Sequence, residues 1–241
     1  MSFDRNFNLS QRMTQELGQA IVSGKYKDDS LPTEADLCDK FGISRSAVRE
    51  AVKMLSAKGL ISSRQRQGIR ILPEEEWNIF DPDVLKWLLD RAPSLEVIRE
   101  FLQMRIAIEP EAASLAARFA KPHEIDAIEA ALIRMEKSPE SNEEKLEADI
   151  AFHVSILYAS SNRFYIRLRD FITTALNVSI RHTSLIKANN QGIIEDHTKV
   201  FTAIKNRNPE RAKNAMFLLI DEALAFIEEA MISEVEQRER V

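Results

Sequence analysis

The sequence predicts a mainly α-helical, two-domain protein. A small N-terminal domain of short helices and one β-hairpin precedes an all-α antiparallel helical bundle. Five of the six glycines lie within residues 1–72 of the 241, where short elements and turns are therefore expected. Apolar residues recur at three- and four-residue steps in both parts, as they do in amphipathic helices. The segment 73–83 holds two prolines and three glutamates, so we expect a linker there and a second domain over 84–241.

Composition and charge narrow the class of protein. Hydrophobic residues make up 44% and charged residues 29% of the chain, which is typical of a soluble globular protein and excludes a disordered chain. No apolar run is long enough for a membrane-spanning helix, and the single cysteine, Cys38, excludes an internal disulfide. We therefore expect a cytoplasmic protein. The net charge of −5 divides unevenly, with 12 basic and 8 acidic residues in 1–72 but 21 and 30 in the remainder.

The elements of the N-terminal domain follow from periodicity and capping residues. Helices are predicted over about 10–22, from Thr33 to about 41, and from Ser44 to about 58, because Thr33 and Ser44 are favourable N-caps. Strands near 60–63 and 69–72 complete a hairpin. This order is that of a winged helix-turn-helix.

The third helix carries the candidate DNA-binding residues. Arg45, Arg49 and Lys53 stand four residues apart and share one face, from which arginine can bind guanine. Ser44 and Ser46 lie at the helix N-terminus and can donate to phosphate. The hairpin tip adds Arg64, Arg66, Gln67 and Gly68. A charged stripe is usually only a solvated face, but here it coincides with a helix-turn-helix and a basic hairpin tip, which favours DNA.

The second domain reads as a series of helices. Pro110 indicates a kink or a new helix start, and Pro122 and Pro209 each suit the first position of a helix. The remaining predicted helices cover about 149–158, 163–188, 193–205 and 209–235. The interior of such a bundle commonly holds a ligand or metal.

Two groups of polar residues in the bundle carry candidate chemistry. Asp149 and His153 are one helical turn apart, a plausible pair of ligands for a divalent metal, although such a pair is more often an ion pair or a capped core histidine. Arg105 lies among apolar residues. It suits a carboxylate ligand or a structural salt bridge with Glu109, and both readings stay open.

Two stretches of the N-terminal domain, LPTEADL at 31–37 and FGISRSAVREAVKMLSAKGLI at 41–61, closely resemble the DNA-binding domain of the GntR family of bacterial transcription factors. The helical part resembles the FadR subfamily and its FCD effector domain, and 77–89 resembles the linker of sugar-acid regulators. The resemblance implies DNA contacts by Arg45, Ser46, Arg49 and the wing. Ala35 stands where many relatives have arginine, so operator preference does not carry over.

The resemblance also implies a site in the bundle. The FCD metal pattern matches Asp149, His153 and His197, but Leu219 replaces its last histidine. Either three residues hold a divalent metal such as zinc or nickel, with effector oxygens completing its shell, or the metal is lost and they bind a polyhydroxylated acid directly. Arg105 matches an arginine that faces the pocket in relatives. Asn177 and Arg181 lie on the helix that corresponds to one lining that pocket.

These observations predict a homodimeric repressor of sugar-acid catabolism genes. It would bind a palindromic operator in double-stranded DNA and be released by an aldonate, a hexuronate or a keto-deoxy sugar acid. Alternatives are a regulator that responds to lactate, a dicarboxylate or acyl-CoA, an effector-free structural DNA-binding protein, and a metal-dependent hydrolase built on Asp149, His153 and His197. We do not expect an enzyme, because no general base or oxyanion donors accompany those residues.

Overall fold

The structure, a computed structural model, describes residues 8–26, 31–64, 68–90, 95–138, 143–186 and 190–239. Side chains are described within these ranges, except in 178–191 and 234–239. The chain forms two units, Met1–Ala92 and Pro93–Val241, and each is considered by itself.

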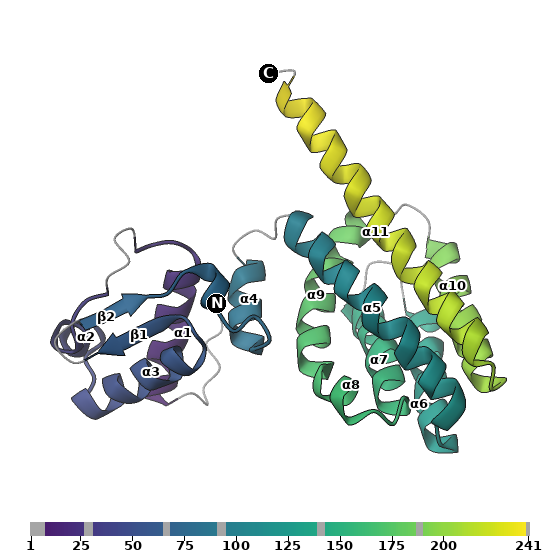
Figure 1. The fold of residues 1–241 in the computed structure, drawn as a ribbon, viewed down its shortest axis with the longest axis horizontal. Helices are drawn as coiled ribbons and strands as arrows, with labels where there is room; N and C mark the ends of the chain where they lie inside the picture. Colours follow the sequence, from purple (N-terminus) through teal and green to yellow (C-terminus); the bar gives the residue numbers. More distant parts are fainter. Residues whose placement is uncertain are drawn as a thin grey trace. The chain divides into compact units, whose positions relative to one another are not determined.

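The first unit combines short helices with a two-stranded sheet (Figure 1). In chain order its elements are α1 (Leu9–Val22), α2 (Glu34–Phe41), α3 (Arg45–Ala57), β1 (Ile61–Arg64), β2 (Gly68–Ile71), the 3-10 turn η1 (Glu74–Glu76) and α4 (Pro82–Asp90). The predicted caps are confirmed, since Thr33 accepts from the amide of Asp36 and Ser44 from that of Ala47. The first helix begins at a capping box that the prediction did not include, formed by Asn8 and Gln11.

The predicted hairpin is also present. β1 and β2 are antiparallel, with Ile61 opposite Ile71 and Arg64 opposite Gly68. Ile61 and Ile69 are buried in the same core as Val48 and Leu55 of α3, which fixes the sheet on the helices. Gly68 has φ +76°, a left-handed conformation that glycine adopts without strain.

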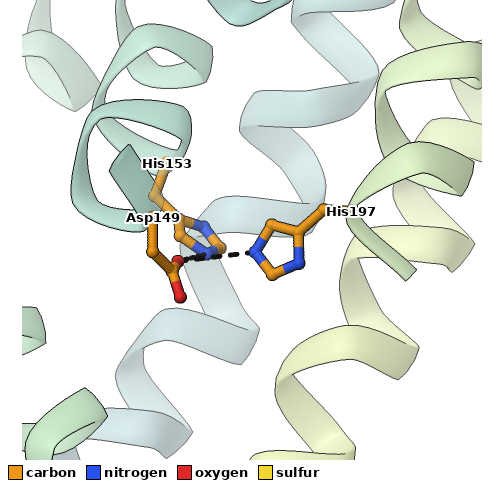
Figure 2. A group of neighbouring side chains, drawn as sticks. All are labelled: Asp149, His153 and His197. Atoms are coloured by element: carbon orange, nitrogen blue, oxygen red, sulfur yellow. Dashed lines mark ion pairs between the residues drawn. The ribbon is translucent and has the colours of Figure 1, made fainter. Parts of the chain in front are cut away.

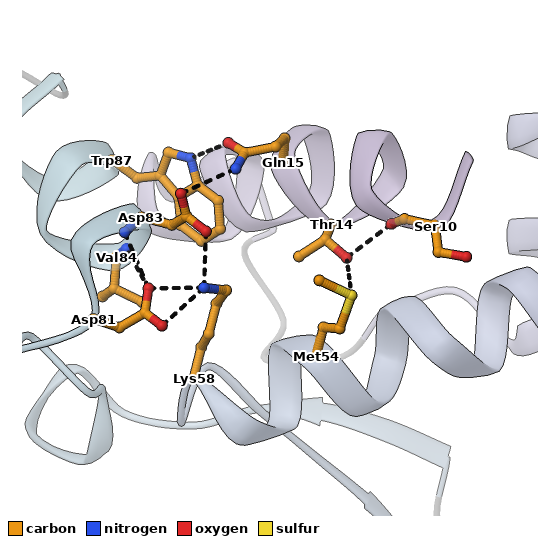
Figure 3. A network of polar contacts seen from close by, with 9 residues as sticks. All are labelled: Ser10, Thr14, Gln15, Met54, Lys58, Asp81, Asp83, Val84 and Trp87. Carbon is orange, nitrogen blue, oxygen red and sulfur yellow. Dashed lines mark hydrogen bonds and ion pairs between the residues drawn. The ribbon is translucent and has the colours of Figure 1, made fainter. Parts of the chain in front are cut away.

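The segment after the hairpin packs on the first unit. Trp87 of α4 is 4% exposed and lies so close to α1 that a Cβ on Gly18 would come within 2.4 Å of its ring. Its Nε1 donates to Gln15 Oε1 at 3.0 Å, and Lys58 Nζ binds Asp81 at 2.7 Å and Asp83 at 2.8 Å (Figure 3). The expected linker at 73–83 and the start of the next unit at 84 therefore differ from the structure, in which the first unit extends to Ala92.

The second unit is helical throughout its described residues. Its elements are α5 (Leu95–Phe119), α6 (Pro122–Lys137), α7 (Glu143–Ala159), α8 (Arg163–Arg167), α9 (Arg169–Ile186), α10 (Asn190–Lys205) and α11 (Pro209–Glu239). α5 lies along α11 (Figure 1) and also packs against α7, which contacts α6 and α9. The mainly α fold class is confirmed.

Three helix boundaries differ from the predicted ones. α5 continues through Pro110 without a new start, whereas the helix predicted from Arg163 is divided at Leu168, where α8 ends before α9 begins. α7 starts at Glu143, earlier than predicted. Among the described residues, no helix combines the length and the apolar character that crossing a membrane requires.

Candidate functional site

One face of α3 is polar and exposed, and the other is buried. Val48, Ala51, Val52 and Leu55 form the buried face. The predicted DNA-binding residues of this helix are all exposed: Ser44, Arg45, Ser46, Arg49 and Lys53. The structure therefore leaves the basic row accessible to a ligand while the apolar row fixes the helix in the domain.

Arg49 has an ionic partner that the sequence did not indicate. Its Nε donates to Glu34 Oε2 at 3.0 Å, and its side chain remains 66% exposed. Glu50 accepts a hydrogen bond from Ser10 at 2.8 Å, so its partner lies within the domain. Glu34 instead orients Arg49, and an exposed pair of this kind costs little to break.

The wing is described only in part. Arg64 and Gly68 are exposed at the ends of β1 and β2. Arg66 and Gln67 lie outside the described residues. The hydroxyls of Ser44 and Ser46 lie 2.9 Å apart at the start of α3.

In the second unit, α7 and α10 bring Asp149, His153 and His197 together (Figure 2). Asp149 Oδ1 lies 3.3 Å from His153 Nε2 and 3.4 Å from His197 Nε2. One potential ligand atom from each residue lies within 4.8 Å of the others. His153 and His197 are buried, at 2% and 3% exposed. Since His197 is 44 positions after His153, this grouping is a product of the tertiary fold.

The other ring nitrogen of each histidine meets an acceptor. His197 Nδ1 lies 2.7 Å from the carbonyl oxygen of Ile193, and His153 Nδ1 lies 2.6 Å from Glu109 Oε2. Because a carbonyl or carboxylate oxygen only accepts, both Nδ1 atoms carry the proton. In the neutral rings each Nε2 then presents a lone pair toward Asp149.

Three acceptor atoms that face one another fit a bound cation. Among the described residues, Asp149 Oδ1 and His197 Nε2 are buried without a hydrogen-bond partner. The separations of 3.3 and 3.4 Å match the edge of a tetrahedron with metal–ligand bonds of about 2.1 Å, which is about 3.4 Å. Two imidazoles and one carboxylate also suit divalent transition metals.

The ionisation of the group follows from the same contacts. Burial acts to raise the pKa of Asp149, but its interactions with His197 and His153 outweigh this and lower it. Burial also acts to raise the pKa of Glu109, yet Arg105 and His153 hold it at about 2. Burial lowers the pKa of His153, and Glu109 and Asp149 more than compensate, so the net shift is upward. Both carboxylates are therefore ionised at neutral pH.

Arg105 is engaged with Glu109, one of the two roles left open from the sequence. Its Nε lies 2.5 Å from Glu109 Oε1, and its Nη2 lies 3.2 Å from Oε2. Both side chains are nearly inaccessible, at 4% and 1% exposed. The signal for this pair was the four-residue spacing on one helix. The contact of Glu109 with His153 was not predicted.

The other residues of the bundle that the sequence singled out are Leu219, Asn177 and Arg181, and none of them belongs to the group of candidate ligands that the described residues form. Leu219 lies on α11 and supplies no ligand, and the ligand group of the described residues consists of Asp149, His153 and His197. Asn177 is half-buried on α9. The side chain of Arg181 lies outside the described residues.

Two family profiles match the chain. Residues 9–71 match the family described as "Bacterial regulatory proteins, gntR family", and residues 100–222 match the FCD domain. The matches correspond to the helix-turn-helix with its wing and to the helices that hold the candidate ligands.

Similar proteins have been named in several bacteria. The galactonate operon transcriptional repressor of Escherichia coli K12 is 32% identical over 215 residues, covering 88% of this chain and 94% of that protein. LutR of Bacillus subtilis, an HTH-type transcriptional regulator, is 31% identical over 81% of this chain and 90% of its own length.

Solved structures resemble the fold. The chain aligns over 94% of its length, with a TM-score of 0.55 and 18% identity, with a structure described as Lar, which controls expression of the Listeria monocytogenes agr system. It aligns with E. coli McbR/YncC over 93% of its length, with a TM-score of 0.51 and 15% identity. The winged helix-turn-helix, the helical second unit and these relatives together place the chain in the GntR family of bacterial transcription regulators, in the FadR-like subfamily that carries an FCD domain.

Proposed function

We propose that this protein is a repressor of sugar-acid catabolism genes, released from its operator by a small carboxylate effector. The observation that carries the proposal is the pairing, in one chain, of an exposed basic helix face with a buried group of cation ligands. Two relatives are operon regulators by name, the galactonate operon transcriptional repressor of Escherichia coli and the Uxu operon regulator of Haemophilus influenzae, and galactonate is itself a sugar acid.

The operator is bound by α3 and the wing. Arg45, Arg49 and Lys53 enter the major groove from the exposed face of α3, and the start of this helix lies against phosphate. Arg64, Arg66, Gln67 and Gly68 bring the wing to the neighbouring groove. Two copies of the chain bind the two halves of a palindromic site, because one recognition helix covers only a few base pairs. The protein acts on the chromosome and so in the cytoplasm.

The effector binds at Asp149, His153 and His197. These residues would hold a zinc or nickel ion, which when bound supplies a Lewis acid for carboxylate and hydroxyl oxygens. With three protein ligands and Leu219 in place of a fourth, coordination positions remain for the effector. Arg105, Asn177 and Arg181 belong to the same pocket in this proposal. The effector changes DNA affinity through its differential affinity for two dimer geometries, a coupling of typically about 1–3 kcal/mol.

The test measures operator binding by the full chain. Fluorescence anisotropy of a labelled DNA fragment from its own promoter reports the binding. Galactonate, other aldonates, hexuronates and keto-deoxy sugar acids are added in turn, and calorimetry measures their binding directly. We expect tight binding without effector and release by at least one sugar acid. Release by lactate, a dicarboxylate or acyl-CoA instead would reject the effector class, and no binding to any promoter fragment would reject the function as a whole.

A further inference from the structure

We propose that Glu109 is a positioning residue of the metal centre, and that Arg105 acts on the centre through it. The proposal rests on the metal site proposed above. It assigns to α5 the task of setting the orientation of one ligand on α7, and it gives Arg105 a role that needs no effector.

The contacts form one buried row behind His153. Arg105 and Glu109 lie one turn apart on α5, and the two oxygens of Glu109 receive Arg105 Nε at 2.5 Å and Nη2 at 3.2 Å. Glu109 Oε2 also lies 2.6 Å from His153 Nδ1. The three side chains are 4%, 1% and 2% exposed, so water does not compete for these contacts.

The contact with Glu109 determines which nitrogen of His153 meets the metal. In the neutral ring that binds a metal, a carboxylate at Nδ1 retains the proton there and leaves the Nε2 lone pair directed at Asp149. Arg105 Nη2 does not make this selection, because it lies 3.2 Å from both ring nitrogens. The carboxylate also makes the ring a stronger donor to a metal.

The two histidine ligands are held in different ways. His197 Nδ1 is 2.7 Å from the carbonyl of Ile193, one turn earlier on the same helix, so its orientation comes from the local backbone. The partner of His153 is a side chain 44 positions earlier in the chain. The geometry of the site therefore depends on how α5 and α7 pack, and a single substitution can uncouple them.

Arg105 stabilises the buried, negatively charged carboxylate of Glu109. An isolated carboxylate at 1% exposure would lose its hydration without compensation, a cost that a bidentate guanidinium offsets. Removing the guanidinium leaves Glu109 without its counter-charge and loosens its contact with His153. Arg105 variants should therefore weaken metal binding when no effector is present, which an arginine that only anchors an effector would not do.

The experiment compares Glu109→Gln with Glu111→Gln in the full chain, with Co²⁺ as the metal probe. Glu111 lies on the same helix but its side chain is 42% exposed and paired with Lys213 at 2.9 Å, so it is the matched control. We expect Glu109→Gln to weaken Co²⁺ binding about 10- to 100-fold. It should also move the paramagnetically shifted N–H proton resonance of one imidazole ligand. Glu111→Gln should do neither. Arg105→Lys, which keeps the charge but not the fork, should weaken binding by a smaller factor.

The outcomes distinguish a failure of the positioning role from a failure of the proposed metal site. Failure of the wild-type chain to bind Co²⁺ would reject the metal site itself. Binding by the wild type and equally tight binding by Glu109→Gln, with an unmoved resonance, would reject only the positioning role. If Glu109→Gln and Arg105→Lys both fail to fold, a measurement on the wild type alone tests the positioning role. Its His153 N–H should exchange slowly with solvent, and fast exchange would overturn the proposal.

Discussion

Arg49 and Arg105 carry the same guanidinium group in opposite surroundings. The Arg49 side chain is 66% exposed and makes one bond to Glu34, whereas Arg105 is 4% exposed and bidentate to Glu109. Exposure leaves the first available to a large partner such as DNA. Burial commits the second to the interior of the bundle, where each of its bonds is strengthened by the low local dielectric.

Arg49→Ala should weaken operator binding by about 1–3 kcal/mol, or roughly 5- to 150-fold, because it removes an arginine that can contact a base or phosphate. Thermal stability should change by less than about 1 kcal/mol, since the ion pair with Glu34 is exposed. Anisotropy titration and a melting curve measure the two effects.

The control is Lys213→Ala, which also removes an exposed basic side chain from an ion pair, here with Glu111 in the second unit. It should leave operator affinity unchanged. Wild-type affinity in Arg49→Ala would show that α3 does not recognise the operator.

At the scale of elements, the position of α4 depends on one close contact. A Cβ on Gly18 of α1 would lie 2.4 Å from the Trp87 ring, and the contact is supported by Gln15 and by the Lys58 pairs with Asp81 and Asp83 (Figure 3). The absence of a side chain at residue 18 thus allows α4 to pack on α1 as part of the first unit.

Gly18→Ala should destabilise the first unit by about 1–3 kcal/mol, because the added methyl group overfills the contact. Gly192→Ala is the control. Nothing lies within 4 Å of a Cβ there, so the change should stabilise α10 by about 0.5–1 kcal/mol, measured by circular dichroism, and leave the tryptophan signal of the first unit unchanged. Both tryptophans, Trp77 and Trp87, lie in the first unit, and their fluorescence follows its unfolding in urea. A neutral or stabilising effect at Gly18 would contradict the packing of Trp87.

The Lys58 network predicts a dependence of stability on alkaline pH. Burial acts to lower the pKa of Lys58, but Asp81 and Asp83 outweigh it and raise the pKa above 10.5. A folded-state pKa above the unfolded one stabilises the fold below about pH 10.5, and this stabilisation is lost as pH rises through the folded value.

Lys58→Met should therefore cost about 1–2 kcal/mol at pH 8, and its deficit relative to wild type should shrink at pH 11. Urea unfolding followed by tryptophan fluorescence at both pH values checks this, with Lys86→Met, at an exposed position on α4, as the control. A deficit that stays constant to pH 11 would argue against the raised pKa.

At the scale of the whole molecule, the two units have different chemistry and different reporters. The first unit contains both tryptophans and the basic helix face, and the second contains the candidate metal ligands. Tryptophan fluorescence therefore reports the first unit, while circular dichroism at 222 nm reports the helices of both.

Removal of metal by a chelator should lower the melting temperature measured by circular dichroism. A ligand at 100 times its Kd stabilises the folded state by about 2.7 kcal/mol. Asp149→Asn should abolish the difference between chelated and zinc-loaded samples, and Asp126→Asn, on the neighbouring α6, should leave it intact. Identical melting curves with and without zinc for the wild type would reject metal binding by this unit.

Local signals in the sequence were enough for most elements. Thr33 and Ser44 predicted helix starts, and the row Arg45, Arg49 and Lys53 lies on the exposed face as expected, because capping and helical periodicity depend only on nearby residues. Pro110 does not begin a new helix, one of its two predicted roles, because α5 continues through it. The expected linker also differs from the structure: its prolines and glutamates resemble a spacer, but the pairs of Lys58 with Asp81 and Asp83 attach it to the first unit.

The sequence by itself therefore determined the two-part helical architecture, the exposed basic face and, through the family resemblance, three candidate ligands. Only the tertiary structure decided that Asp149 Oδ1 lies 3.4 Å from His197 Nε2, that Glu109 holds His153, and that Arg105 is bound to Glu109. The physical reason is that spacing along a helix sets which residues share a face, whereas contacts between α5, α7 and α10 depend on how buried surfaces pack, which no local pattern encodes.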